Sequence, residues 1–298
     1  MLMAKCEVCF RHCEIKEGAL GFCGARTCKN GRVVSENYGR ITSCALDPIE
    51  KKPLARFFPG SKILSVGSYG CNLRCPFCQN SEISWGEEVA MFQKDQNATS
   101  GRMAMVQEVT PDDLVRVALR EKDEGNIGVA FTYNEPFISY EFVRDTAKLS
   151  QKYGLKNVLV TNGTVELPIL RELLPYIDAM NIDLKGFTDR YYEKVLGGNR
   201  KVVMDCIEES VKSCHVELTT LIVPGENDDP EEIREMTKWI CGLKDKDGKV
   251  IGETIPLHVS RFFPRFHMQE KSATAVSTVY RLAEVARESL KYVYTGNC

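Results

Sequence analysis

A chain of 298 residues, 43% of them hydrophobic and 27% charged, is long enough to bury one large core with a small appendage. The formal net charge of −2 argues against a general nucleic-acid or acidic-membrane surface, because it supplies no long-range attraction. No run of about eighteen uncharged apolar residues occurs, and residues 1–15 lack the apolar stretch of a signal peptide. We therefore expect a cytoplasmic protein without a nucleic-acid or membrane partner.

The chain contains 13 cysteines, an odd number that does not suit complete pairing in disulfides. In a reducing compartment these thiols stay free, so binding of a metal or a cluster is the better use of a dense set. One set lies within the first thirty residues and another at residues 71–78. Cys206, Cys214 and Cys241 are scattered, and we expect them in helices or at helix ends as small core residues.

From about residue 60, short β-rich runs alternate with helical patterns. Thr110 and Asp229 each precede a proline and two acidic residues, which is typical of a helix start. The strands are expected at residues 62–67, 127–131, 157–160, 179–183, 216–222 and 254–259. Repeated strand–helix–strand units predict an α/β fold with a parallel sheet, which we interpret as a partial (β/α)6 TIM-like barrel.

Two stretches depart from this alternation. Residues 81–109 are polar and poorly periodic, and we expect them to form an excursion near the open end of the barrel. The first fifty residues have no βα period and many glycines and cysteines, which indicates a small metal-held unit. We therefore divide the chain into a Cys-rich N-terminal extension at residues 1–55 and a barrel at residues 56–298.

Unusual residues follow four successive predicted strands. The first strand ends in a cysteine loop, the second in "TYNEP", the third in "TNG" and the fourth in "DLK". In parallel α/β barrels the reactive groups sit at the carboxyl ends of the strands, so these segments should meet at one rim. The rim is therefore the predicted site.

The segment "CNLRCPFC" places Cys71, Cys75 and Cys78 in a loop after the first strand. Gly70 and Pro76 oppose a regular helix there, so the thiols can wrap a compact cluster. A structural zinc normally takes four protein ligands, whereas a 4Fe–4S cluster with three thiolates leaves one iron open. This pattern favours the cluster.

The same segments carry a family resemblance. "CNLRCPFC" is similar to the signature of the radical S-adenosylmethionine (SAM) superfamily. "VAFTYNEPF", "VLVTNG", "MNIDLKGF" and "LTTLIVPGENDD" resemble, in order, the strand ends of pyruvate formate-lyase activating enzyme and its relatives. The Cys-rich start, "NYGRITSCALDPIEKKPLARFFPGS" and "YVYTGN" resemble the radical SAM enzyme of the AmmeMemoRadiSam system.

This resemblance implies that a 4Fe–4S cluster reductively cleaves SAM to a 5′-deoxyadenosyl radical, which abstracts hydrogen from a protein, peptide or small-molecule substrate. It also implies an electron donor such as flavodoxin or ferredoxin. The subfamily likeness implies Memo-like and AMMECR-type protein partners. A glycyl-radical-enzyme activase is one alternative, and a non-catalytic iron–sulfur electron carrier is an alternative of another class.

Nine residues are the predicted cofactor contacts. By resemblance, Asn134 and Glu135 should meet the methionine ammonium, although Tyr133 and Asn134 replace two glycines of the family's Gly-Gly-Glu-Pro segment. Asp183 and Lys185 alternate along a strand end, which directs both side chains to one face, where the ammonium can pair with the SAM carboxylate or with Asp183 itself. The other predicted contacts are Phe77 and Asn80 on the adenosine side, Thr161 and Asn162 in the third loop, and His258 on the last strand. His258 has the alternative of a hydrogen-bonded core histidine.

Cys6, Cys9, Cys13 and Cys23 form CxxCxxxC followed by a further cysteine, within a glycine-rich stretch. Four thiols can close around zinc or hold an auxiliary 4Fe–4S cluster. The spacing leaves that choice open. A zinc-stapled scaffold protein would account for this set alone.

Overall fold

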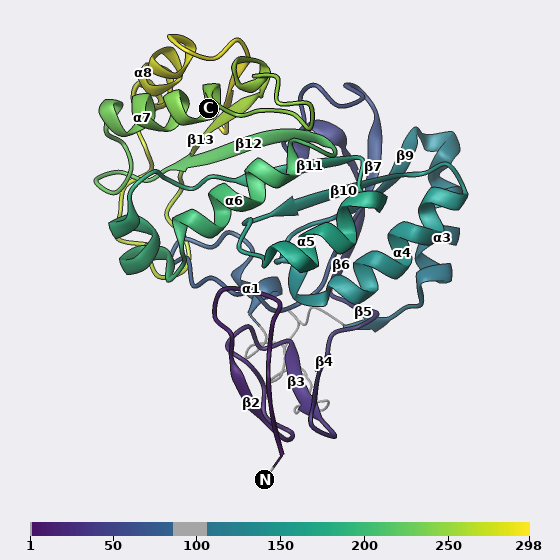
Figure 1. The fold of residues 1–298 in the computed structure, drawn as a ribbon. Coiled ribbons are helices and arrows are strands. Elements are labelled where there is room, and N and C mark those ends of the chain that lie inside the picture. The colour runs from purple at the N-terminus through teal and green to yellow at the C-terminus, as the bar shows by residue number, and fades with distance from the viewer. Residues whose placement is uncertain (1, 86–105) are drawn as a thin grey trace.

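The computed structural model describes residues 2–85 and 106–298, so most of the predicted excursion at 81–109 lies outside the described residues. Its centre is an eight-stranded sheet in the order β14-β13-β12-β11-β10-β9-β7-β6 (Figure 1). The strands are β6 (Ser43–Pro48), β7 (Lys62–Gly67), β9 (Asn126–Phe131), β10 (Lys156–Thr161), β11 (Ala179–Asp183), β12 (His215–Ile222), β13 (Leu257–Arg261) and β14 (Val293–Gly296). Neighbours from β7 to β14 run parallel, and only β6 pairs antiparallel.

The predicted α/β class with a mostly parallel sheet is confirmed, and the six predicted strands correspond to β7 and β9–β13. The strand expected at 254–259 begins three residues later, because Gly252–Thr254 forms a 3-10 turn. Two further strands, β6 and β14, form the edges of the sheet. β14 has only four residues, and neither edge strand shows the burial pattern that marks a strand in sequence.

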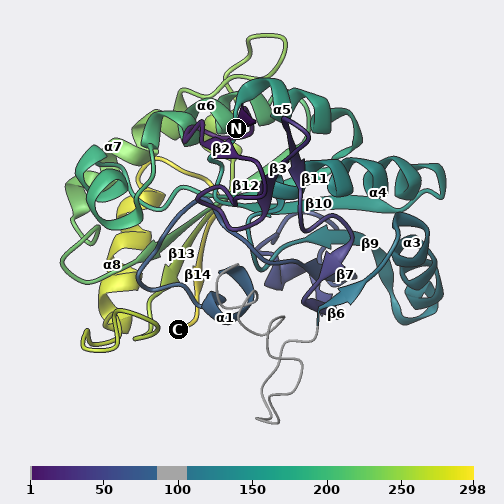
Figure 2. The same ribbon diagram turned by 90° about the horizontal axis from the view of Figure 1, so that it is seen from below.

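Helices follow the strands and form an arc on the outer side of the sheet (Figure 2). They are α3 (Pro111–Arg120), α4 (Tyr140–Lys152), α5 (Leu167–Leu173), α6 (Arg200–Ser210), α7 (Pro230–Cys241) and α8 (Val276–Arg287), and the short α1 (Ser81–Ser84) follows the cysteine loop. The predicted helix starts are confirmed: Thr110 and Asp113 form a capping box, and Asp229 accepts from the Glu231 amide. Among the described helices none is long and apolar enough to cross a bilayer.

The two faces of the sheet are covered differently. Leu64, Val129 and Leu159 belong to the large core against the helices, whereas their neighbours along each strand point to the inner face. At one end of the inner face, the segment after β6 packs as a plug. The plug residues Ile49, Leu54 and Phe57 contact Ile63, Ala130, Val158 and Ala179. This end of the inner face is therefore closed by apolar burial.

The N-terminal residues form two hairpins, β1 (Met3–Lys5) with β2 (Glu14–Lys16) and β3 (Arg26–Lys29) with β4 (Arg32–Ser35). A short pair follows, β5 (Arg40–Ile41) with β8 (Gln107–Glu108). The next strand, β6, already belongs to the central sheet. The division of the chain at residue 55 stays a prediction.

Candidate functional site

The loop after β7 carries Cys71, Cys75 and Cys78. Its first turn is at Gly70, with φ of +92°, where an added Cβ would lie 2.6 Å from the Ala25 side chain. Only glycine fits this close approach and this backbone conformation. The Cys78 amide donates to the Cys75 carbonyl at 3.1 Å, so the loop turns back on itself and gathers its thiols.

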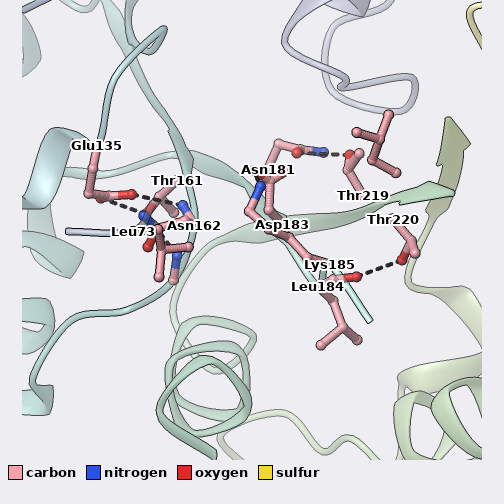
Figure 3. A network of polar contacts seen from close by, with 12 residues as sticks. Leu73, Glu135, Thr161, Asn162, Asn181, Asp183, Leu184, Lys185, Thr219 and Thr220 are labelled. Carbon is pink, nitrogen blue, oxygen red and sulfur yellow. Dashed lines mark hydrogen bonds and ion pairs between the residues drawn. The ribbon is translucent and has the colours of Figure 1, made fainter. Parts of the chain in front are cut away.

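One cavity of about 380 Å³ adjoins this loop and the carboxyl ends of β9, β10 and β11. Its lining includes the three loop cysteines and eight of the nine predicted cofactor contacts: Phe77, Asn80, Asn134, Glu135, Thr161, Asn162, Asp183 and Lys185. Figure 3 shows two polar groups in this region, one around Glu135 and one around Lys185. Segments far apart in the sequence therefore share one rim.

The loop thiols are poorly suited to remain free anions. Burial raises the pKa of all three, that of Cys75 to about 11, although the Lys185 ammonium opposes the shift at Cys75 and Cys78. Binding to a metal centre is what stabilises a thiolate in such a place. No fourth cysteine lines this cavity within the described chain, so the donor set fits a cluster held by three thiolates.

The number of loop thiols agrees with a cluster. Cys71, Cys75 and Cys78 all line the cavity. Ligands of a single ion must converge on a point, whereas each thiolate of a cluster binds a different iron. Three thiols around one cavity are compatible with the second arrangement.

Glu135 is the buried anion of the cavity, with 1% of its surface exposed. Its carboxylate accepts hydrogen bonds from the Thr161 hydroxyl and the Asn162 amide, both at 2.8 Å, and from the Phe137 amide at 3.0 Å. Burial nevertheless raises the pKa of Glu135 to about 7. In the described part of the chain no basic side chain forms an ion pair with it, so the carboxylate faces the cavity without a counter-charge.

Asn134 holds the cysteine loop in place. Its side-chain oxygen accepts from the Ser68 amide at 3.0 Å, and its amide nitrogen donates to the carbonyls of Tyr69 and Gly70 at 3.2 Å. These bonds use the polar atoms that we expected to meet the methionine ammonium. Asn134 thus lines the cavity while positioning the loop.

Tyr133 adopts the conformation that glycine would adopt at this place in the family motif. Its φ is +72°, a left-handed value that is strained for a tyrosine. Its hydroxyl donates to Asp47 at 2.7 Å, and Lys52 lies 4.9 Å from the centre of its ring. Tyr133 therefore has a backbone conformation that suits glycine, the residue of the family motif at this place.

Asp183 and Lys185 form an ion pair of 2.7 Å on the inner side of the rim. Burial lowers the pKa of Lys185, but Asp183 and the nearby Cys75 thiol more than compensate and raise it overall. The ammonium therefore stays charged beside the cysteine loop. Asn162 also contacts the loop. Its side-chain nitrogen lies 3.7 Å from Cys71 Sγ and donates to the Asn72 side-chain oxygen at 2.9 Å.

The structure does not bring His258 into the cavity. Its Nε2 lies 2.7 Å from a carboxylate oxygen of Glu217, which is fully buried deeper on the inner face. The period of two along β13 points His258 inward, but Ser260 is the residue of that strand that lines the cavity. The placement matches the hydrogen-bonded core alternative.

One wall of the cavity was not predicted from the sequence. Lys51, Lys52 and Pro53 line it from the segment after β6. Lys52 is 2% exposed and pairs with Asp47 at 2.9 Å. A signal existed in "DPIEKKP", where an acid precedes two adjacent lysines and a proline, but nothing local indicates that this segment reaches the rim.

The N-terminal thiols of Cys6, Cys9, Cys13 and Cys23 line a second, enclosed cavity together with Arg11, Arg26 and Asn72. The remaining N-terminal cysteines lie elsewhere: Cys28 is next to Glu17, and Cys44 is exposed on β6. Cys28 packs in the same buried cluster as Cys6, but neither Cys28 nor Cys44 lines the cavity.

A comparison with protein families decides the identity of the chain. The model described as the radical SAM superfamily matches residues 65–240, more than half of the chain. The chain belongs to the radical SAM superfamily. Membership implies a 4Fe–4S cluster and SAM as cofactors, and the loop thiols and the cavity fit both.

Relatives extend this assignment in two directions. A protein of Methanocaldococcus jannaschii, named "Uncharacterized protein MJ0808", is 38% identical over 295 residues, covering 98% of this chain and 81% of its own. The pyruvate formate-lyase 1-activating enzyme of Escherichia coli is 28% identical over 206 residues, 67% of this chain and 75% of the enzyme. The chain is thus related to a glycyl-radical activase.

Solved structures support the fold. Streptococcus suis SuiB bound to S-adenosylmethionine aligns with a TM-score of 0.55 and 14% identity, over 79% of this chain and 52% of SuiB. A radical SAM methyltransferase from Sphaerobacter thermophilus gives a TM-score of 0.53 and 15% identity, over 80% of this chain and 67% of the other. At these identities the likeness concerns the fold alone.

Proposed function

We propose that the protein is a radical SAM enzyme in which Cys71, Cys75 and Cys78 hold a 4Fe–4S cluster and the adjoining cavity binds SAM. When bound, the cluster supplies the electron that cleaves SAM to methionine and a 5′-deoxyadenosyl radical, which abstracts hydrogen from the substrate. The observation that carries the proposal is the buried Glu135 carboxylate, which faces the same cavity as three thiols and forms no ion pair with any residue that the structure describes.

Each wall of the cavity has a task in this proposal. Glu135 would pair with the methionine ammonium of SAM, since a cation beside a desolvated carboxylate restores its ionised form. Lys185 would pair with the methionine carboxylate while remaining close to Asp183. Phe77, which is 3% exposed, would supply an apolar surface for adenosine. Asn134 would hold the cysteine loop at the correct depth.

The apolar packing on the inner face of the sheet would help to exclude water from the cavity. The plug of Ile49, Leu54 and Phe57 closes one end of that face, and the cavity lies toward the other end. With the arc of helices outside, this arrangement supports our interpretation of the sheet as a partial (β/α)6 barrel. A radical formed in the cavity would be shielded on the closed side.

Formation of 5′-deoxyadenosine tests the proposal. Anaerobically reconstituted protein with dithionite and SAM should release 5′-deoxyadenosine, and Cys71→Ala should abolish this release. Cys44→Ala is the matched control, because Cys44 is exposed on β6 and lines neither thiol cavity. Failure of iron-replete wild-type protein to exceed the Cys71→Ala background would refute the proposal.

The activase reaction is a second candidate for the substrate, supported by the relationship to pyruvate formate-lyase activating enzymes. In that case hydrogen would be abstracted from a glycine Cα of a partner polypeptide. Mixing the enzyme with a candidate partner that carries deuterated glycine should transfer deuterium into 5′-deoxyadenosine. Transfer only from another labelled molecule would exclude this candidate.

We also propose membership in the AmmeMemoRadiSam system, with Memo-like and AMMECR-type partners and a flavodoxin or ferredoxin as electron donor. The motifs outside the superfamily core support this proposal. Co-purification of such partners, and a dependence of product formation on them, would test it. An electron carrier without catalysis would not need the polar cavity beside the thiols, which argues against that alternative.

The four N-terminal thiols are proposed to bind a metal, either zinc or an auxiliary 4Fe–4S cluster. The support is that all four line one enclosed cavity. Iron, sulfide and zinc analysis of purified protein distinguishes the two forms.

A further inference from the structure

The four N-terminal thiols are gathered from two turns. The Cys6 amide donates to the Cys13 carbonyl at 2.9 Å, which brings the two ends of the first turn together. Cys23 lies in a second turn, closed by a 3.0 Å hydrogen bond from the Gly24 amide to the Gly21 carbonyl. Three of the thiols belong to buried residues, and Cys13 is half-buried. The four thiols thus line one enclosed cavity whose walls are held by backbone hydrogen bonds.

A buried cation lines the same cavity with an unused donor. Arg26 is 4% exposed, and its terminal nitrogens donate to Glu141 at 2.8 and 3.0 Å. Its Nε has no hydrogen-bond partner within the part of the chain that the structure describes. Arg26 and Cys6 line the same cavity, so the cation faces the space that the thiols surround. A buried N–H without an acceptor is costly, and an anionic sulfur in the cavity would satisfy it.

The wall between the two thiol cavities is thin. The Cys71 amide donates to the Cys23 carbonyl at 3.2 Å, so one ligand of each set is in backbone contact with the other. The next residue, Asn72, lines the N-terminal cavity together with Cys9, and its side-chain nitrogen donates to the Thr164 carbonyl at 2.8 Å. Asn72 also accepts from Asn162, whose amide lies 3.7 Å from Cys71 Sγ.

Arg11 adds a charge that both sets share. Its Nε donates to the Asn72 carbonyl at 2.7 Å. Arg11 lines the N-terminal cavity, and Asn72 directly follows Cys71, so the guanidinium lies near both sets. A positive charge between two anionic centres reduces their mutual repulsion.

We infer that the N-terminal thiols bind a second 4Fe–4S cluster, ligated at all four irons, that passes single electrons to the SAM-binding cluster across the Cys23–Cys71 contact. In each transfer the second cluster loses one electron and the SAM-binding cluster gains one. A donor of the ferredoxin or flavodoxin class then reduces the second cluster again. The inference rests on the proposed function, because it needs the SAM-binding cluster as acceptor.

Two features favour a cluster over zinc. The cavity adjoins the cysteine loop through the hydrogen bond between the Cys71 amide and the Cys23 carbonyl. The cavity also takes part of its lining, Asn72 and Ile138, from the barrel side of the molecule. A zinc staple would belong inside the N-terminal unit, whereas a relay has to touch the cluster loop.

The experiment uses a full-length Cys71→Ala/Cys75→Ala/Cys78→Ala variant, reconstituted anaerobically with iron and sulfide. We expect about four irons and four sulfides per chain and a reduced-cluster electron paramagnetic resonance signal, against about eight irons in wild type. Zinc in place of iron, or no metal in a variant whose circular dichroism is native, overturns the inference. Neither result bears on 5′-deoxyadenosine formation by wild type, so this failure is separate from failure of the proposed function.

A reciprocal variant keeps the inference testable if the triple variant does not fold. Cys9→Ser/Cys23→Ser should lose about half of the iron and slow reduction of the SAM-binding cluster by ferredoxin at least tenfold. Cys28→Ser is the matched control, because Cys28 is buried in the same hairpin unit but does not line the cavity. Unchanged iron content or unchanged reduction rate in the double variant contradicts the relay.

Discussion

Two buried glutamates lie at different depths of the molecule and have opposite acidities. Glu135 lines the thiol cavity, whereas Glu217 lies deeper on the inner face, beside the segment that packs as the plug. Burial raises the pKa of both carboxyls, but at Glu217 the hydrogen bonds of His215 and His258 and two backbone amides reverse the shift and lower it to about 2. At Glu135 burial prevails, and the pKa is raised to about 7.

The difference lies in the partners. The Glu217 carboxylate is within 2.9 Å of two imidazole nitrogens and of the amides of Ala55 and Arg56. Glu135 has two amides and a hydroxyl, but no basic side chain among the described residues. The Glu217 carboxylate has a full set of hydrogen-bond and charge partners, so it stabilises the fold. The Glu135 carboxylate lacks a basic partner among the described residues, so it can accept a cationic ligand.

The largest expected effect is on stability, at the completed site. Glu217→Gln should lower the free energy of unfolding by about 3 kcal/mol, because it leaves buried donors facing an amide. The protein that remains folded should bind SAM as wild type does. Chemical denaturation and SAM titration of the reconstituted protein measure the two quantities, and a specific loss of SAM affinity in this variant would break the comparison.

Glu135→Gln should give the opposite pattern. Loss of the counter-charge for the methionine ammonium should weaken SAM binding about 100-fold, the size typical of truncating one member of a buried charge pair. The free energy of unfolding should fall less than in Glu217→Gln, since burial raises the pKa of Glu135 to about 7 and the apo protein gains little from ionising this carboxyl. Equal SAM affinity of Glu135→Gln and wild type would mean that another group holds the ammonium.

The dependence of the free energy of unfolding on acidic pH gives a further test of Glu217. The folded pKa of Glu217 lies below that of an unfolded glutamate, so its contribution is complete above about pH 4.5 and is lost as the pH falls toward 2. The gap in unfolding free energy between wild type and Glu217→Gln should therefore shrink across that window. Denaturation curves at several pH values measure it, and a gap that does not depend on pH would rule out an ionised Glu217.

How much of this could be predicted from the sequence depends on whether the cause is local. Spacing of the thiols, strand ends and helix caps are local patterns, and eight of nine predicted cofactor contacts line the cavity. The sequence does not show how far His258 lies from the carboxyl end of β13. The period of two determines which face of the sheet its side chain lies on, but not its distance from the cavity. Lys52 reaches the rim only because β6 pairs with β7, a long-range contact without a periodic signal.

The smallest effect concerns Tyr133, whose strained backbone lies beside the incomplete site. Because its φ is +72°, glycine should be tolerated there better than alanine, although alanine is the better residue in most structured positions. Tyr133→Gly and Tyr133→Ala both remove the ring and its hydrogen bond to Asp47, so their difference isolates the backbone strain. We expect Tyr133→Gly to be the more stable by about 1 kcal/mol.

The matched control for this pair is Ala147→Gly in helix α4, where the backbone is helical and the same exchange should destabilise the protein. Chemical denaturation of the three variants under one buffer gives the comparison. If Tyr133→Ala proves as stable as Tyr133→Gly, the left-handed turn is not maintained in solution. The placement of Asn134 and Glu135, which depends on that turn, would then need another explanation. If Tyr133→Gly is the more stable, the tyrosine ring must contribute something that offsets the backbone strain. Its contacts with Asp47 and Lys52 place this contribution at the wall of the proposed SAM-binding cavity.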